Sequence, residues 1–244
     1  MLSNKIQSKF TTVFFVVGLL FTILLPCTQA ITISPVHLSM SVKKPIISLT
    51  VTNDSARIMT FQTKTVIWSQ VNGDNAYSDT NDLMITPPIV SIQANSSQVF
   101  RLALFRNSPH LVELSYRVIL EDITAELASE ENGLSFKFNH SLPLMYAPIT
   151  PLDSVLWTRC DSNVVGKSCL RMDNQGNRHA KLVRFNAVST TAQVPYEGAK
   201  TVLAGSSAQW FYTTMIDAEN TTHLEVTTSR GPVTLIIEDL SWAN

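Results

Sequence analysis

The sequence predicts an all-β fold built from two β-sandwich domains. From Ile31 onward, β-branched and other apolar residues alternate with polar ones almost throughout, which is the pattern of half-buried strands. Turn residues such as Pro45 and the Asn-Gly-Asp segment at 72–74 separate these runs, and no amphipathic helical pattern is convincing. Removal of a 30-residue leader leaves about 214 residues, a length that suits two domains of about a hundred residues each.

Residues 1–30 are expected to form a cleaved secretory signal peptide. Lys5 and Lys9 precede the apolar run Phe10–Leu25, and small residues near Ala30 suit cleavage before Ile31. A transmembrane anchor is the alternative, but the run is short for a spanning helix. Cys27 raises the possibility of a lipoprotein, and the proline that precedes it argues against lipidation. The sequence therefore predicts secretion, with no stable membrane insertion after signal cleavage.

The near balance of basic and acidic residues excludes binding to a strongly charged partner through net charge. Two of the 18 basic residues lie in the leader, so 16 basic residues face 19 acidic ones in the mature chain. This balance leaves no footprint for nucleic acid or an anionic membrane. No phosphate-binding glycine loop or nucleophile elbow accompanies any serine, and the chain has only eight glycines. We therefore expect no cofactor and no enzymatic activity.

Cys160 and Cys169 are the two cysteines that remain after cleavage. In an oxidising compartment, such a close pair most plausibly forms one disulfide. Zinc is a poor alternative, because a structural zinc site normally takes four ligands from cysteine and histidine.

Two prolines indicate where the domains meet. Pro148 and Pro151 bracket a short, stiff connector, which predicts a first domain over 31–148 and a second over 151–244. In the first domain, Asn95 is expected at a left-handed turn position, which asparagine adopts more cheaply than most residues.

The segment Leu134–Pro148 is predicted to be a long last strand of the first domain. It follows the acidic loop 121–133, and its alternation places Leu134, Phe136 and Phe138 on one face and Lys137 and Asn139 on the other. Two interpretations stay open from the residues alone. Either the three apolar side chains pack inward as an ordinary core strand, or they are offered to another chain.

A set of motifs spread over nearly the whole mature chain identifies a resemblance. The motifs are Ser34-Pro-Val, Val51-Thr-Asn53, Pro87-Pro88 followed by Ile92, Gln98 and Arg101, Tyr116-Arg117 with Leu120 and Ile123, Ser141-Leu-Pro143, and Asn174-Gln-Gly-Asn-Arg-His-Ala180. In this order and spacing, they resemble the PapD-like periplasmic chaperones of chaperone–usher pilus assembly. The last two motifs are most similar to the archaic or spore-coat-like branch.

The resemblance implies two immunoglobulin-like sandwiches set at an angle, with a cleft between them. It also implies that Leu134, Phe136 and Phe138 are donated as a β-strand to an incomplete pilin subunit, and that an outer-membrane usher then receives the subunit. Without a subunit, the same strand would be an exposed apolar edge that can self-associate. The alternative function is a secreted β-sandwich adhesin or a structural pilus subunit.

In this family a basic pair in the cleft binds the carboxylate at the end of the subunit, and here the sequence departs from the pattern. His37 stands where an arginine is expected, and Asn139 stands where a basic residue is usual. Lys137 lies on the same strand face as Asn139, and Arg101 or Arg117 would also serve if either pointed into the cleft. Our hypothesis is that His37, Asn139 and Lys137 together hold the carboxylate, with Arg101 as a further candidate.

Overall fold

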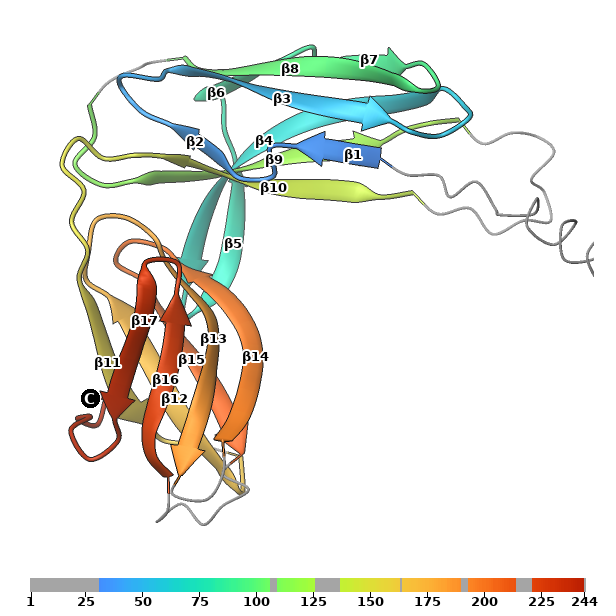
Figure 1. Cartoon of the computed structure of the whole chain (residues 1–244). Coiled ribbons are helices and arrows are strands. Elements are labelled where there is room, and N and C mark those ends of the chain that lie inside the picture. The colour runs from blue at the N-terminus through green and yellow to red at the C-terminus, as the bar shows by residue number, and fades with distance from the viewer. Residues whose placement is uncertain are drawn as a thin grey trace, which may run out of the picture.

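The computed structural model describes residues 31–105, 109–125, 137–162, 164–189, 193–213 and 221–243. All regular structure in these ranges is β, and none of it is a helix that could cross a membrane. The predicted signal peptide lies outside the described residues. Figure 1 shows two β bodies set at an angle to each other, with the first ten strands in one and the remaining seven in the other.

The first sandwich consists of two sheets that pack face to face. One sheet has the order β1-β3-β8-β6, and the other has the order β2-β10-β9-β4-β5, with β7 also paired to β4. The strands are β1 (Ile31–Ser34), β2 (Leu38–Met40), β3 (Ile46–Asn53), β4 (Met59–Val71), β5 (Asp74–Asp79), β6 (Leu83–Thr86), β7 (Ile89–Ile92), β8 (Ser96–Leu104), β9 (Leu114–Asp122) and β10 (Asn139–Tyr146).

The alternation predicted from the sequence forms the core of this sandwich. Leu49 and Val51 on β3 face Val118 and Leu120 on β9, and all four side chains are fully buried. Their polar neighbours along each strand point away from the core. Asn95 joins β7 to β8 with a φ of 52°, so the predicted left-handed turn position is confirmed.

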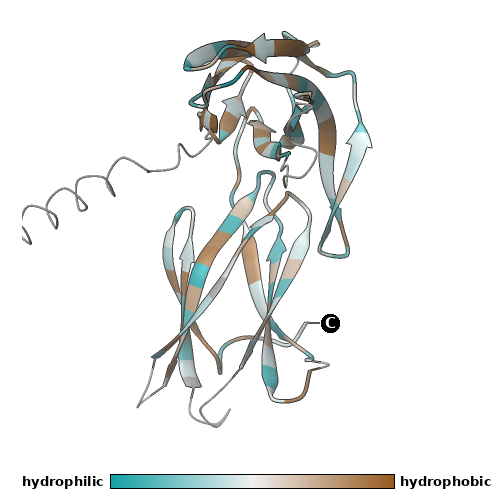
Figure 2. Cartoon of the chain, turned by 90° about the vertical axis from the view of Figure 1, so that its right-hand side faces the viewer, coloured by the Kyte–Doolittle hydropathy of each residue, from teal (hydrophilic) through white to brown (hydrophobic). Residues whose placement is uncertain are grey.

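The second sandwich has the sheet orders β11-β12-β15 and β14-β13-β16-β17. Its core contains Leu182, Phe185, Leu224 and Trp210, and brown apolar segments alternate with paler and teal ones along its strands (Figure 2). The strands are β11 (Val155–Cys160), β12 (Lys167–Asn174), β13 (Ala180–Ser189), β14 (Gln193–Val202), β15 (Ser207–Thr213), β16 (Thr221–Thr228) and β17 (Gly231–Ile236). The all-β, two-sandwich fold predicted from the sequence is therefore confirmed.

One hairpin of the first sandwich extends to the second. β4 is 13 residues long, and its last part pairs only with β5. Asn72 and Gly73 join the two strands with φ values of 53° and 85°, the left-handed pair that a tight two-residue hairpin requires. Figure 1 shows the hairpin projecting from the first sandwich towards the second.

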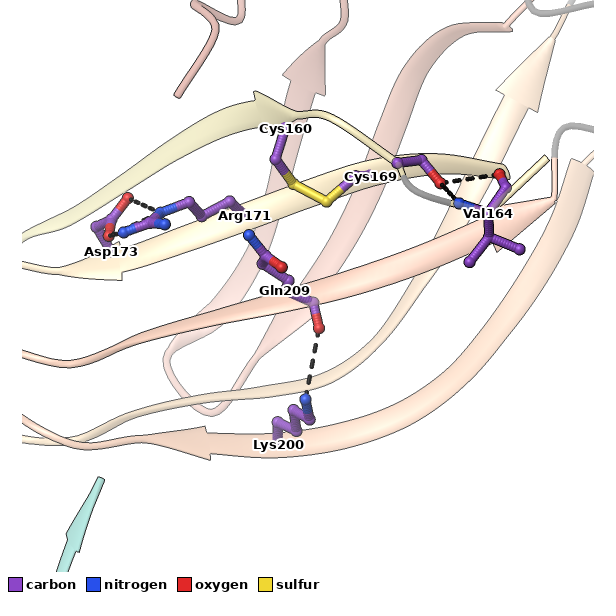
Figure 3. The surroundings of a disulfide bond; sticks show 8 residues. Cys160, Val164, Cys169, Arg171, Asp173, Lys200 and Gln209 are labelled. Carbon is purple, nitrogen blue, oxygen red and sulfur yellow. Dashed lines mark hydrogen bonds and ion pairs between the residues drawn. A yellow bond between two sulfur atoms is a disulfide. The ribbon is translucent and has the colours of Figure 1, made fainter. Parts of the chain in front are cut away.

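The predicted disulfide joins Cys160 to Cys169, which confirms the pairing. The two residues are directly opposite each other on β11 and β12, and both are buried (Figure 3). The bond therefore links neighbouring strands of one sheet across a short loop.

Replacing both cysteines with alanine is expected to lower the free energy of unfolding by ~2–3 kcal/mol, because the unfolded chain regains the entropy of an open loop of about ten residues. Denaturant unfolding of the mature protein measures the effect. Reductant should destabilise the wild type by a similar amount and leave the double variant unchanged. Equal stability of the two proteins under oxidising conditions would contradict this account.

Candidate functional site

A cleft of ≈ 760 Å³ lies between the two sandwiches. The first sandwich contributes strand residues of its six-stranded sheet, among them Trp68, Arg117 and Met145. The second contributes the loop around His179 and the start of β13, together with the end of β14. Glu113 is the single acidic residue among the described residues that line this cleft. The cleft is therefore a junction of the two domains in which basic side chains predominate.

The six-stranded sheet turns one row of side chains towards the cleft. Arg117 on β9 is in register with Val66 on β4 and with Pro143 on β10, so these three lie side by side on one face. His37 immediately precedes β2, whose Leu38 pairs with Leu144 of β10. His37 is thus level with Pro143, and it lies about 10 Å from the Arg117 strand, two strand spacings away.

Arg117 is a half-buried cation without a counter-charge among the residues that the structure describes. Its guanidinium carbon lies 3.9 Å from the centre of the Trp68 ring. Its Nε is buried and has no hydrogen-bond partner. Burial lowers the pKa of this guanidinium, partly offset by Tyr77, although an arginine remains protonated near neutral pH. An anion that entered the cleft would pair with it directly.

Two lysines add positive charge from the second sandwich. Lys181 on β13 and Lys200 on β14 are on neighbouring strands, one register step apart, and both line the cleft. Lys200 reaches the carbonyl of Gln209 at 3.5 Å (Figure 3), a weak contact. Neither lysine forms an ion pair in the described part of the chain. Both are therefore available to attract an anion.

The other basic side chains of the second sandwich that line the cleft have acidic partners within the protein. Arg178 and Arg230 both pair with Asp153. The hydrogen bond from Arg178 is the main reason that the pKa of Asp153 lies below its ordinary value. His179 Nδ1 lies 2.8 Å from Oε1 of Glu113, which also accepts the His179 backbone N–H at 2.9 Å. The His179–Glu113 contact joins the two sandwiches, whereas the two arginines share the Asp153 carboxylate within the second domain.

The junction is reinforced by Asn177. Its side-chain amide donates to the carbonyls of Leu111 at 2.7 Å and Thr150 at 2.9 Å, and its carbonyl oxygen accepts from the backbone of Leu152. The backbone of Glu113 donates to the Asn177 carbonyl at 2.8 Å. One turn of the second sandwich therefore binds the connector and the first sandwich together.

The predicted carboxylate-binding residues occupy different places. His37 lines the cleft, as expected. Lys137 and Asn139 do not line it: Asn139 pairs with Glu121, four residues from Pro143, which places it about 13 Å along β10 from the Arg117 row. Lys137 and Asn139 have the same alternation parity as Pro143, as predicted, but they lie too far along the chain to reach the cleft.

Arg101 is a correction. It lies on β8, in the opposite sheet of the first sandwich, between Ser48 of β3 and Thr86 of β6. Its neighbours Phe100 and Leu102 point into the core, so Arg101 is on the outer, exposed face of that sheet. The core of the sandwich thus separates it from the cleft. Arg117, which the sequence offered only as a substitute, is the arginine that lines it.

The predicted donor strand is described only in part. Leu134 and Phe136 lie outside the described residues. Phe138 immediately precedes β10, its side chain is 64% exposed, and its carbonyl accepts the backbone N–H of Asp122 at 3.4 Å. It has the same alternation parity as Leu142 and Leu144, both of which are buried. Phe138 therefore continues the core-facing row of β10 past the edge of the sandwich, where most of its side chain is exposed.

Sequence reasoning missed Trp68 and Gln70 as residues of the site. Trp68 lies on the cleft face of β4, where it is covered by Arg117 and by Leu203 of the second sandwich. The available signal was the length of β4, since a 13-residue strand extends past the other strands of its sandwich.

A family model of known proteins matches the first half of the chain after the leader. The family model described as pili and flagellar-assembly chaperone, PapD N-terminal domain, matches residues 30–151, half of the chain. No curated protein sequence matches the chain.

Several solved structures share the fold over almost their whole length. A chain of the CsuC–CsuE chaperone–tip adhesion subunit pre-assembly complex from the archaic chaperone–usher Csu pili of Acinetobacter baumannii is 18% identical, with a TM-score of 0.65 and coverage of 88% of this chain and 100% of that one. The Salmonella enterica SafA pilin complex with the SafB chaperone contains a chain at 14% identity, TM-score 0.60, with 85% and 96% coverage. The Pseudomonas aeruginosa CupB2 chaperone is 13% identical, with a TM-score of 0.57 and coverage of 84% of this chain and 100% of that one.

Proposed function

Because the chain belongs to the family of PapD-like pilus-assembly chaperones, we propose that it is a periplasmic chaperone that holds pilin subunits by strand donation and delivers them to an outer-membrane usher. Two of the similar structures are complexes of a chaperone with a tip adhesion subunit and with a pilin. The corresponding partner of this chain is a fimbrial subunit that lacks one strand of its own sandwich.

The donated segment is the one that leads into β10. Leu134, Phe136 and Phe138 present alternate apolar side chains, and the main chain between them supplies hydrogen bonds to the edge of the subunit. Burial of an exposed side chain of this size contributes about 1.5–3 kcal/mol. The exposure of Phe138 at the edge of the sandwich supports this role, since a core strand would bury it. Self-association through the same segment is expected when no subunit is present.

The cleft holds the carboxylate at the end of the subunit. The observation that carries this assignment is Arg117, a half-buried guanidinium that forms no ion pair among the described residues, in a cleft where Glu113 is the single carboxylate among the described lining residues. A carboxylate pairs with a guanidinium through two parallel hydrogen bonds, which fixes its position as well as its charge. His37 lies in the same cross-strand row, and Lys181 and Lys200 line the cleft from the second sandwich. The first sandwich thus binds the carboxylate, and the lysines add attraction at longer range.

Co-expression in the periplasm tests the proposed function. The tagged mature protein is expected to co-purify with a secreted pilin-like subunit encoded beside it. Changing Phe136 and Phe138 together to serine should release the subunit while the chaperone stays folded, because the donor side chains no longer fill the acceptor groove. Phe105→Ser is the matched control, since Phe105 is 71% exposed on the first sandwich but lies outside the donor segment.

Two outcomes would count against strand donation. If the subunit is retained by the double variant, the binding surface lies elsewhere on the chain. If no subunit is captured by the wild type, the alternative of an adhesin or structural subunit gains support, and the mature protein should then assemble with itself in the presence of an usher.

A further inference from the structure

The tip of the β4–β5 hairpin contacts the second sandwich through Gln70. The side-chain amide of Gln70 donates to the carbonyl of Thr201 at 2.9 Å, and its oxygen accepts the backbone N–H of Leu203 at 2.9 Å. Gln70 therefore binds the end of β14 as if it were one more backbone unit of a strand, with one donor and one acceptor. At the same tip, a Cβ on Gly73 would lie 3.4 Å from the Ser207 carbonyl, so the second sandwich approaches closely there too.

This contact is connected to the Trp68 ring in two ways. Asn75, which is opposite Gln70 on β5, accepts a hydrogen bond at Oδ1 from Gln70 Nε2 at 3.1 Å and another from Trp68 Nε1 at 2.8 Å. Leu203 also packs directly on Trp68 in a small buried cluster that includes Met145. Asn75 of the same hairpin thus fixes the polar edge of the indole, and Leu203 of the second sandwich packs in the cluster that covers the ring.

The Arg117 guanidinium lies over the same indole ring, 3.9 Å from its centre. Trp68 is only 4% exposed, so the ring is held between the second sandwich and the arginine. Since the buried Nε of Arg117 has no hydrogen-bond partner, the ring is the main contact that orients this side chain among the described residues. The orientation of the arginine therefore depends on the position of the ring.

From this chain of contacts we propose that Gln70 and Trp68 are positioning residues, through which docking of the second sandwich on the β4–β5 hairpin orients Arg117 for an anionic ligand. The inference rests on the proposed function, because the ligand that it concerns is the subunit carboxylate. Release of the hairpin from β14 would remove the packing of Leu203 and leave the indole held only at its edge by Asn75, and Arg117 would then sample several rotamers. A disordered cation binds a carboxylate less tightly, since its side-chain entropy must be lost on binding.

A measurement without ligand tests the coupling directly. In ¹⁵N-labelled mature protein, the Nε–Hε signal of Arg117, assigned by its loss in Arg117→Lys, is expected to show the positive heteronuclear NOE of an ordered group. In Gln70→Ala this NOE should fall towards the value of Arg101, an exposed arginine. Gln62→Ala is the matched control: Gln62 is exposed on the same strand and makes no contact with the second sandwich among the described residues, so the Arg117 signal should not change.

Leu203→Ala removes the contact with Trp68 from the second sandwich and should also reduce the NOE of Arg117. Well-dispersed backbone spectra would show that both variants remain folded. An ordered Arg117 signal in both Gln70→Ala and Leu203→Ala would overturn the proposal. So would an Arg117 signal that is already disordered in the wild type.

Ligand binding separates this inference from the proposed function. The probe is the co-expressed subunit, compared with the same subunit carrying a three-residue Gly-Ser-Gly extension that displaces its carboxylate. If the wild type captures both equally, the carboxylate site of the proposed function fails and the inference fails with it. If the wild type prefers the native end, Gln70→Ala should reduce that preference about tenfold. An unchanged preference would overturn the inference and leave the proposed function intact.

Discussion

Replacing Arg117 with alanine is expected to weaken subunit binding about 100-fold, the range observed when one partner of a desolvated charge pair is removed. The reason is that the carboxylate would still be desolvated in the cleft, but without the guanidinium that accepts it. Arg117→Lys should bind the subunit more weakly than the wild type and more tightly than Arg117→Ala. Lysine keeps the charge but loses both the planar fork and the stacking on Trp68. Competition between tagged and untagged chaperone for one purified subunit measures the affinity.

Arg101→Ala is the control for this experiment. It removes the same charge from the outer face of the opposite sheet, so it should leave binding unchanged. If Arg101→Ala weakened binding as much as Arg117→Ala, the effect would come from net charge and not from the cleft. If neither change had an effect while the Phe136 and Phe138 double variant still lost the subunit, strand donation would stand and the carboxylate would bind elsewhere.

The sequence predicted what depends on local pattern. Period-two alternation is a property of each strand alone, so the two sandwiches, the inward row of β10 and the turn at Asn95 could all be inferred. The disulfide between Cys160 and Cys169 could be inferred for the same reason, since the two residues are close in the chain.

The composition of the cleft depends on register and domain placement, which the local pattern does not contain. Alternation places Arg117 opposite in direction to Tyr116 and Val118, but only the pairing of β9 with β10 puts it level with Pro143 and His37. The same parity made Lys137 and Asn139 look equivalent to it, although they lie farther along the strand. The contact of Gln70 with Leu203 spans 133 residues and exists only because of the angle between the domains.

The same asparagine–arginine spacing occurs once in each domain. Asn53 is followed four residues later by Arg57, and Asn174 is followed four residues later by Arg178. In each sandwich, the asparagine side chain donates to the carbonyl of that arginine and accepts the backbone N–H two residues on. The two domains thus use one device at equivalent strand ends, which a search for spaced polar residues would have detected.

Replacing Asn174 with alanine is expected to lower the stability of the second sandwich by about 3–5 kcal/mol, because several buried backbone groups would lose a partner at about 1–3 kcal/mol each. Asn174 is 2% exposed, and its amide donates to the carbonyls of Arg178 at 2.8 Å, Val202 at 3.0 Å and Leu203 at 3.1 Å. The turn that it closes is tight, since a Cβ on Gly176 would lie 2.5 Å from the Leu152 carbonyl. Water cannot easily take the place of the lost amide there.

The loss of the Asn174 amide should also affect the cleft, because this amide supports two contacts that the second sandwich makes with the first. On one side it holds the turn that carries His179, the partner of Glu113; on the other it holds Leu203, which packs on Trp68. We therefore expect Asn174→Ala to lower the unfolding midpoint of the second sandwich and to loosen the Arg117 Nε–H signal in the folded state. Asn186→Ala is the control and should change neither, because Asn186 is half-buried on β13 and its amide makes only a long contact of 3.4 Å with Glu225 Oε2. A loss of less than about 1 kcal/mol in Asn174→Ala would show that the strand end is held by its backbone pairing alone.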